Sequence, residues 1–368
     1  MYNILKLNKI SPVINDLFND NYMLSETEEN PDGIILRSFN MATYQVQNRL
    51  EAIARAGAGV NNIPVADMTN KGIVVFNTPG ANANAVKELV LCGMLLASRD
   101  IIGGCSWVNT LTCDVEKTTE KGKGNYAGYE IMGKTLGIIG LGAIGILVAN
   151  ACVGLGMKVI GYDMFLTEEN KAKLNASVKI VTLEELYANS DIITVHVPLN
   201  DQTKNMINAS TFATMKDGVI LMNMSRAGLV NSTDLKDALK NGKVRKYVVD
   251  FPTEEVLHCE NIIAIPHLGA STEEAEDNCA IMASNQLIEY LEKGNIVNSV
   301  NFPCISKDWT KKYRTCILFR EGCDVIQSLS GESKTAVRKG IGYAIFDTDS
   351  ELTVPKCDNI IKVRKLEK

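Results

Sequence analysis

Three glycines within residues 134–163, KTLGIIGLGAIGILVANACVGLGMKVIGYD, constrain the fold of this chain more than any other feature. The pattern G-x-G-x-x-G falls on Gly140, Gly142 and Gly145, directly after the apolar run TLGIIG and at the start of a helical pattern. A second apolar run, KVIGYD, follows the helical stretch. A strand, a glycine turn, a helix and a second strand in this order predict a βαβ unit.

Short apolar runs alternate with helical patterns along most of the chain. The apolar runs are GIILRS, IVVFN, TLGIIG, KVIGYD, DIITVHVP, GVILMNMS, KYVVDF and NIIAIPH. Such runs are typical of parallel strands that are buried on both faces. A length of 368 residues exceeds what one core usually holds. We therefore predict an α/β fold with two doubly wound parallel-sheet domains of the Rossmann or flavodoxin type.

The composition indicates a globular protein that acts on small molecules. A net charge of −5 and 46% hydrophobic residues give no strong attraction to nucleic acid or membranes. The first residues lack the apolar core of a signal peptide, and no run reaches the ~18 apolar residues of a membrane span. The ten cysteines form no CxxC pair and no Cys/His cluster at metal spacing. We expect a cytoplasmic protein with reduced thiols and no metal site.

The glycine pattern also predicts the ligand of the βαβ unit. The first glycine permits a tight turn, the second lets a pyrophosphate approach the backbone, and the third brings the helix close to the strand. Asp163 ends the second apolar run, where an acid can bind a ribose 2′-hydroxyl. This carboxylate would repel a 2′-phosphate, and no arginine follows it in GYDMFLTEEN. We therefore predict NAD rather than NADP.

A nicotinamide cofactor exchanges hydride, so its substrate must also exchange a proton, and a histidine does this near neutral pH. His267 stands at a strand exit beside a glycine, whereas His196 lies within an apolar run and His258 in a polar connector. Arg226 also follows an apolar run and offers a forked guanidinium for a carboxylate. A carboxylate such as Glu254, hydrogen-bonded to the imidazole, would fix its tautomer and raise its pKa.

Six segments resemble, in order, the signature segments of the D-isomer-specific 2-hydroxyacid dehydrogenases. They are GKTLGIIGLGAIG, GLGMKVIGYD, LEELYANSDIITVHVPL, NMSRAGLVN, VVDFPTE and PHLGASTEEAEDN, and the resemblance covers about residues 1–303. Within that family the chain is most similar to the members that oxidise 3-phosphoglycerate to 3-phosphooxypyruvate with NAD. The resemblance implies that this reaction, the first step of L-serine biosynthesis, is the activity of the chain.

The resemblance also implies roles for individual residues. Arg226 would bind the substrate carboxylate, His267 would transfer the proton, and Glu254 would pair with His267. Most members read Asp-Val-Phe where this chain reads Asp250-Phe251, which leaves Glu255 as the second candidate for that pairing. The positions implied to line the NAD are Gly140, Gly142, Ala143, Ile144, Gly145, Asp163, His196, Val197, Pro198, Met224, Ser225, Asp250 and Gly269, with Asp250 on the nicotinamide carboxamide.

The resemblance further implies a discontinuous substrate-binding domain, residues 1–100 and 285–303, around an NAD-binding domain of residues 101–284. Arg37 and Ser38 in IILRSFN would bind the substrate phosphate side, and Gly59 and Val60 in AGAGVNNI would offer backbone amides. Residues 304–368 would form a reduced ACT-like α+β module, with strands at RTCILFRE, GIGYAIFDTDS and NIIKVRKL. A dimer or larger homo-oligomer is expected, with the polar arm 109–129 reaching toward the partner subunit.

Two alternatives remain open at this point. Another 2-hydroxyacid dehydrogenase, such as a glyoxylate or hydroxypyruvate reductase, would act on a small unphosphorylated acid and would not need Arg37. A non-catalytic NAD-sensing scaffold could retain the same arginine, glutamate and histidine.

Overall fold

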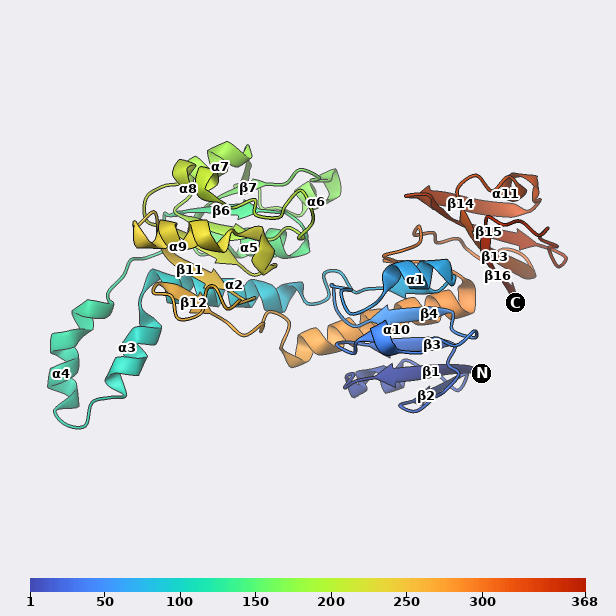
Figure 1. Cartoon of the computed structure of the whole chain (residues 1–368), viewed down its shortest axis with the longest axis horizontal. Helices are drawn as coiled ribbons and strands as arrows, with labels where there is room; N and C mark the ends of the chain where they lie inside the picture. Colours follow the sequence, from blue (N-terminus) through green and yellow to red (C-terminus); the bar gives the residue numbers. More distant parts are fainter. The chain divides into compact units, whose positions relative to one another are not determined.

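The computed structural model describes all residues 1–368, which form two compact units. The first unit combines Met1–Asn82 with Glu273–Lys368, and the second is Ala83–Thr272. The second unit is therefore an insertion into the first. Figure 1 shows the ribbon coloured along the chain, with the second unit in cyan to light orange.

The second unit is built on a seven-stranded parallel sheet in the order β12-β11-β10-β9-β6-β7-β8. Read from the other edge, this is the Rossmann order 3-2-1-4-5-6 with one added strand. The strand order reverses between β6 and β9, which places a crevice at their carboxyl ends. The strands are β6 (Thr135–Ile139), β7 (Lys158–Tyr162), β8 (Lys179–Ile180), β9 (Ile192–Val195), β10 (Val219–Asn223), β11 (Val244–Val249) and β12 (Ile262–Ala264).

Helices cover both faces of this sheet, which explains why its central strands are apolar on both sides. On one face, α2 (Ala83–Ser98) and α5 (Ala143–Gly154) share a core with β6, β10 and β11. On the other face lie α7 (Leu183–Asn189), α8 (Ala209–Thr214) and α9 (Ser232–Lys240). The short helix α6 (Glu168–Ala172) follows β7. Every residue of β9 and β10 is buried.

The predicted polar arm, residues 109–129, is part of a helical projection of the second unit. The projection contains α3 (Ile101–Val108), α4 (Val115–Gly122) and a 3-10 turn, Lys123–Tyr126, and no residue of these three segments is buried. Trp107 stacks on Tyr126 with ring centroids 5.3 Å apart and holds the projection together. No single helix of the chain is long and apolar enough to cross a membrane; α2 and α3 reach that length and composition only as a pair bent by 69°.

The first unit contains a five-stranded parallel sheet in the order β2-β1-β3-β4-β5. This is the flavodoxin-like order 2-1-3-4-5. Its strands are β1 (Tyr2–Leu7), β2 (Tyr22–Ser25), β3 (Gly33–Leu36), β4 (Ala52–Arg55) and β5 (Val74–Phe76). The helix α1 (Val65–Asn70) packs on one face and α10 (Glu273–Lys293) on the other. The prediction of two doubly wound parallel sheets is confirmed.

The C-terminal residues form a four-stranded antiparallel sheet in the order β14-β15-β13-β16. The strands are β13 (Tyr313–Arg320), β14 (Glu332–Arg338), β15 (Ile341–Thr348) and β16 (Ile360–Glu367). A four-residue helix, α11 (Val325–Ser328), joins β13 to β14, and residues 349–359 join β15 to β16 without regular structure. The three predicted strands are β13, β15 and β16, while β14 was not predicted.

One face of this C-terminal sheet packs on α10 and joins the core of the first unit. Cys316 and Leu318 of β13 and Tyr343 and Ile345 of β15 belong to the same buried cluster as Leu287 of α10. Because strand side chains alternate between faces, their neighbours point the other way and form a second, smaller core under α11 and residues 349–359. The helix α10 therefore lies between two sheets.

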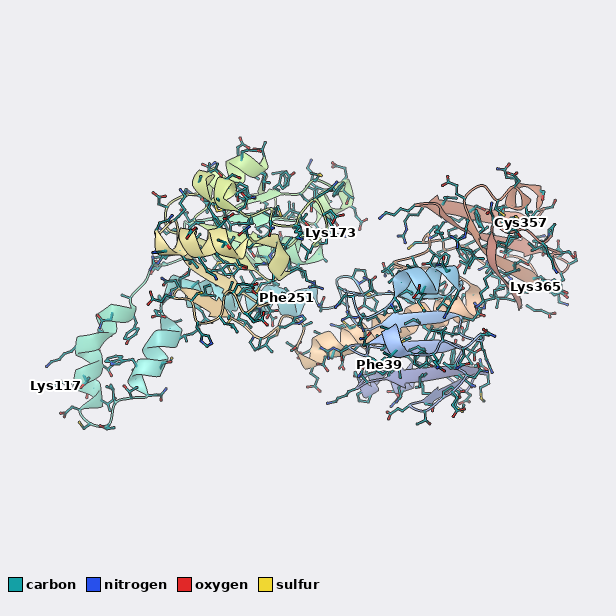
Figure 2. The ribbon with its side chains drawn as sticks, viewed as in Figure 1. Phe39, Lys117, Lys173, Phe251, Cys357 and Lys365 are labelled. Carbon is teal, nitrogen blue, oxygen red and sulfur yellow. The ribbon has the colours of Figure 1, made fainter.

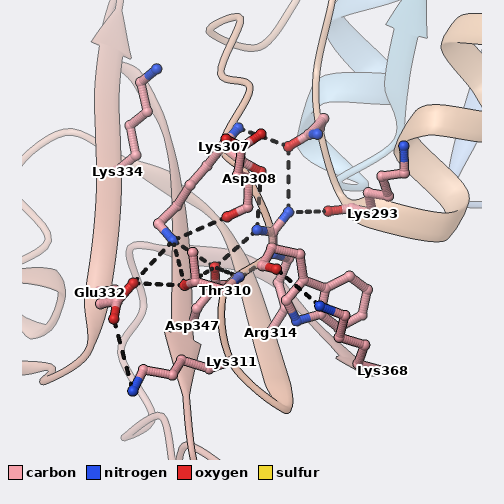
Figure 3. A network of polar contacts seen from close by, with 12 residues as sticks. Lys293, Lys307, Asp308, Thr310, Lys311, Arg314, Glu332, Lys334, Asp347 and Lys368 are labelled. Carbon is pink, nitrogen blue, oxygen red and sulfur yellow. Dashed lines mark hydrogen bonds and ion pairs between the residues drawn. The ribbon is translucent and has the colours of Figure 1, made fainter.

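A buried ion pair anchors the C-terminal sheet to the end of α10 (Figure 3). Arg314 donates two hydrogen bonds to Asp347, of 2.7 and 2.9 Å, and both side chains are fully buried. Arg314 also donates to the carbonyl oxygen of Lys293, the last residue of α10, at 2.8 Å. A cation at a helix C-terminus satisfies carbonyl groups that lack partners within the helix.

Candidate active site

The glycine turn lies at the carboxyl end of β6 and leads into α5, as predicted. Gly140 has φ +99°, and a Cβ atom there would lie 2.7 Å from the carbonyl oxygen of His196. At Gly145 a Cβ would meet the carbonyl oxygen of Gly140 at 2.0 Å, so only glycine lets the helix approach the strand this closely. At Gly142 nothing lies within 4 Å of such an atom, so the space beside the turn is open.

Asp163 lies at the carboxyl end of β7 and is bonded to the glycine turn. Its carboxylate accepts hydrogen bonds from the backbone nitrogens of Leu141 and Phe165, each at 2.7 Å. A carboxylate can accept about four hydrogen bonds, so capacity remains for ribose hydroxyls. Asp163 therefore fixes the turn and presents a negative charge beside it.

His196 follows β9, on the other side of the point where the strand order reverses. Its Nε2 atom is 2.9 Å from the hydroxyl of Thr194, and its Nδ1 atom is buried without a hydrogen-bond partner. Burial lowers the pKa of His196 to about 4, so the ring is neutral at pH 7. This histidine cannot supply a proton near neutral pH. Val197 and Pro198 continue the same loop.

The turn after β10 positions Ser225 and Arg226. Asn223, fully buried at the end of β10, accepts from the backbone nitrogen of Ser225 at 3.0 Å and donates to the carbonyl oxygen of Arg226 at 2.8 Å. The Ser225 hydroxyl donates to the carbonyl oxygen of Val195. Met224, which precedes Ser225, is buried. Asn223 is a supporting residue that the sequence reasoning missed.

Asp250 follows β11 and holds the loop that carries His267. Its buried carboxylate accepts hydrogen bonds from the backbone nitrogens of Leu268 and Gly269, at 2.7 and 2.9 Å. Burial raises the pKa of Asp250, while these two bonds and the charge of His267 oppose that change. His267 itself has φ +55°, an unusual backbone conformation for a non-glycine residue. The loop is therefore held in a defined shape by a neighbouring strand end.

Phe251, labelled in Figure 2, contacts both groups expected to do the chemistry. The Arg226 guanidinium carbon is 4.7 Å from the centroid of the Phe251 ring, and the His267 ring centroid is 4.2 Å from the same centroid. These three residues follow β10, β11 and β12, which are neighbours in the sheet. Both Arg226 and His267 are exposed, whereas Phe251 is half-buried. The aromatic ring is therefore a shared contact of the guanidinium and the imidazole.

The two candidate acids lie in the turn after Pro252. Glu254 and Glu255 are both exposed, and His258 is exposed on the same connector. Nothing in the fold of this connector selects one glutamate over the other as the partner of the imidazole, so the assignment of Glu254 stays a prediction.

In the first unit, Arg37 and Ser38 follow β3, and the loop with Gly59 and Val60 follows β4. Asn62 joins these loops, because its amide donates to the carbonyl oxygens of Arg37 and Phe39, at 3.2 and 2.7 Å. The Asn62 amide oxygen accepts from Arg55 at 3.1 Å.

Arg37 forms an ion pair with Glu276 of α10. Arg55 lies against Gly57, where a Cβ atom would come within 2.3 Å of its guanidinium. The sequence reasoning did not select Arg55 or Asn62, although both belong to the same pair of strand ends.

The residues of the second unit fit an NAD molecule. The open space at Gly142, the N-terminus of the twelve-residue helix α5 and the Asp163 carboxylate lie together at the carboxyl edge of the sheet. A helix N-terminus favours phosphate, and a carboxylate at this place favours ribose hydroxyls. The fold and the loop thus define a dinucleotide-binding α/β unit.

Comparison with known proteins agrees with this class. Residues 92–269 match the model of the family described as D-isomer specific 2-hydroxyacid dehydrogenase, NAD binding domain. Residues 92–269 therefore form an NAD-binding domain of the D-isomer-specific 2-hydroxyacid dehydrogenase family, and the prediction of NAD as the cofactor is confirmed.

Curated relatives are similar over most of the chain. D-3-phosphoglycerate dehydrogenase of Archaeoglobus fulgidus is 35% identical over 287 residues, which are 74% of this chain and 52% of that protein. The protein of the same name from Methanocaldococcus jannaschii is 35% identical over 319 residues, which are 84% of this chain and 59% of that protein. The chain thus spans about half the length of the curated relatives it matches.

Among solved structures, cofactor (NAD+)-bound 3-phosphoglycerate dehydrogenase of Entamoeba histolytica is similar with a TM-score of 0.63 and 26% identity. The match covers 82% of this chain and 98% of that one.

Proposed function

We propose that this protein oxidises 3-phospho-D-glycerate to 3-phosphooxypyruvate with NAD, the first step of L-serine biosynthesis. The observation that carries the proposal is the placement of Arg226, Phe251 and His267 on three neighbouring strand ends, in a sheet whose first strand leads into a dinucleotide turn. The names of the curated relatives support the phosphorylated substrate.

The proposed reaction removes a hydride and a proton from the same carbon–oxygen unit of the substrate. When bound, NAD supplies the hydride acceptor. Arg226 binds the substrate carboxylate through its forked guanidinium. His267, as the neutral base, accepts the proton of the C2 hydroxyl, and Glu254 or Glu255 stabilises the imidazolium that results. In the reverse direction the imidazolium returns that proton to the carbonyl oxygen.

The remaining assignments follow the same scheme. Asp163 binds the ribose hydroxyls of NAD, and Asp250 binds the nicotinamide carboxamide. Arg37 and Ser38 bind the substrate phosphate. Residues 101–284 are the proposed NAD-binding domain, and residues 1–100 with 285–303 are the proposed substrate-binding domain. Residues 304–368 are proposed to be a reduced ACT-like module.

We further propose a cytoplasmic homodimer. Ile101 and Ile102 of α3, just before the arm, and Val115 of α4, within it, are each at least 42% exposed, and neither helix has a buried residue. Burying such side chains in a partner subunit would stabilise the arm by the hydrophobic effect.

One observation favours a second candidate, a reductase of small unphosphorylated 2-oxo acids. Arg37 is already paired with Glu276, and this partner would compete with a substrate phosphate. A glyoxylate or hydroxypyruvate reductase needs no such arginine, so the pair would then be structural.

The deciding experiment measures initial rates of NADH change with four acids in turn. We expect NADH to form with 3-phosphoglycerate, and slower reactions with glyoxylate, hydroxypyruvate and 2-oxoglutarate. His267→Gln should lower turnover at least ~10²-fold, while His258→Gln, which changes an exposed histidine on the nearby connector, should not. Faster turnover of glyoxylate or hydroxypyruvate would favour the second candidate. NAD binding without turnover of any acid would favour a sensing scaffold.

Arg37→Ala tests the phosphate assignment. Loss of a charge-assisted contact costs about 1.5–3 kcal/mol, so kcat/KM for 3-phosphoglycerate should fall roughly ten- to a hundred-fold. Glu276→Gln is the matched control, because it frees the guanidinium without removing it. An equal loss on unphosphorylated acids would show that Arg37 is structural or binds the shared carboxylate.

A further inference from the structure

Two cysteines, Cys323 and Cys357, lie side by side in the small core under α11 and residues 349–359. Cys323 lies between β13 and α11, and Cys357 lies three residues before β16. Their sulfur atoms are 3.7 Å apart, although the residues are 34 positions apart in sequence. Cys323 is only 6% exposed, whereas Cys357 is partly exposed at the surface (Figure 2). One thiol of the pair is therefore within reach of solvent and the other is not.

The backbone around both cysteines is tied into one frame. The backbone nitrogen of Arg320 donates to the carbonyl oxygen of Asn359 at 2.7 Å, and the Asn359 amide donates to the carbonyl oxygen of Gly322 at 3.2 Å. These bonds link the end of β13, just before Cys323, to the start of β16, just after Cys357. Bringing the sulfur atoms from 3.7 Å to the ~2.05 Å of a disulfide needs a shift of ~1.7 Å, which is the scale of side-chain rotation.

The segment that carries Cys357 has little else to hold it. Residues 349–359 have no regular secondary structure, and only Leu352, Val354 and Cys357 pack against the small core under α11. Lys356 and its neighbour Pro355 are exposed. A covalent link at Cys357 would therefore restrain a segment that lacks regular secondary structure.

We propose that Cys323 and Cys357 form an oxidative modification site, a thiol pair that closes to an intramolecular disulfide by exchange with a small-molecule disulfide. The thiolate of Cys357 attacks one sulfur of the oxidant, forms a mixed disulfide and releases one thiolate. The thiolate of Cys323 then attacks the sulfur of Cys357, forms the Cys323–Cys357 bond and releases the second thiolate. The two protein thiols lose two electrons and two protons, and the small disulfide is reduced to two thiols.

The order of these steps follows from accessibility and acidity. Cys357 reaches solvent and reacts first. Burial, and then the neighbouring thiol of Cys357, raise the pKa of Cys323, so its thiolate is scarce at neutral pH and closure is the slower step. Closure should therefore accelerate as the pH rises toward 9, because thiolate is the attacking species.

The test exposes the full-length protein to oxidised glutathione and maps its peptides without reduction. We expect a Cys323–Cys357 cross-linked peptide, about 2 Da lighter than the sum of its reduced parts, and its release by dithiothreitol. Cys304→Ser, which removes an exposed cysteine just before the C-terminal sheet, is the matched control and should leave the cross-link unchanged.

Limited trypsin digestion gives a second readout. A disulfide between Cys323 and Cys357, which are 34 residues apart, should slow cleavage after Lys356 roughly tenfold or more in the wild type. Cys323→Ser should show no slowing and should accumulate glutathione on Cys357. The proposal is overturned if wild-type Cys357 keeps its glutathione adduct, if Cys323 pairs elsewhere, or if cleavage after Lys356 is equally fast in both redox states.

Discussion

Removing the charge of Asp347 should destabilise the C-terminal sheet strongly. Asp347→Asn keeps the side-chain shape but leaves the fully buried guanidinium of Arg314 without a counter-ion. Lys307, whose side chain is 14% exposed, loses the same partner. Breaking a buried pair in this way costs about 3–5 kcal/mol, because an uncompensated charge remains in the interior. We expect the free energy of unfolding of the C-terminal sheet to fall by that amount.

The pH dependence of stability gives an independent estimate of the free energy that the Asp347 charge contributes. Burial alone would raise the pKa of Asp347, but hydrogen bonds from Arg314, Lys307 and the backbone of Thr310 outweigh it and lower the pKa from 3.8 to about 2. By linkage this difference corresponds to about 2 kcal/mol. Since the folded-state pKa is the lower one, this stability is fully present above about pH 4 and is lost as the pH falls toward 2. Asp347→Asn should remove this part of the acid dependence.

The assay is urea unfolding followed by tryptophan fluorescence. The chain has two tryptophans, and in a Trp107→Phe background only Trp309 reports. Its ring lies 5.1 Å from the Arg314 guanidinium carbon, so its emission follows the buried pair directly. Asp349→Asn is the matched control, because Asp349 also pairs with a lysine but is 82% exposed, and such pairs contribute about 0–1 kcal/mol. Equal effects of the two substitutions would refute the reasoning.

Three further predictions concern the candidate active site. Asp163→Ala should weaken the binding of NAD more than that of NADP. The ratio of the kcat/KM values for the two cofactors should therefore fall, and an unchanged ratio would show that Asp163 does not bind the ribose. His267→Gln should lower kcat at least ~10²-fold with nearly unchanged NAD affinity in a fluorescence titration, and near-normal turnover would make it a packing residue. Phe251→Leu should lower kcat/KM roughly tenfold, because the contacts to Arg226 and His267 are lost, whereas Phe251→Tyr should keep most activity; equal losses would indicate a purely steric role.

The strands with the clearest sequence signal are buried on both faces. β9 and β10 read as continuous apolar runs because helices cover both sides of them. β14, ESKTAVR, was not predicted because all but one of its residues are exposed, so its sequence carries no apolar alternation. β8 is a two-residue exposed strand and left no signal for the same reason. Edge strands of this kind are specified by pairing with a neighbour rather than by their own composition.

The candidate site divides in the same way. The glycine turn and Asp163 could be predicted because a single βαβ unit contains them. Asn62 could not be predicted, because its side chain binds backbone carbonyls of a loop that lies 23 and 25 residues earlier in the sequence. Asn223 was missed for a related reason: a buried amide that orients Arg226 looks, in sequence, like any polar residue at a strand end.

The order of strands in the second unit limits how a protein of this design can change its substrate. Asp163 follows β7, the second strand from one edge of the sheet, and His267 follows β12 at the other edge. Neighbouring strands are about 4.8 Å apart, and this spacing is set by backbone hydrogen bonds in a buried core rather than by side chains. The separation between the strand ends that carry Asp163 and His267 therefore stays constant when loops change. Insertions and substitutions in the loops after the strands can alter the shape and charge of the space offered to a substrate. The distance across the sheet that a bound cofactor would span does not change.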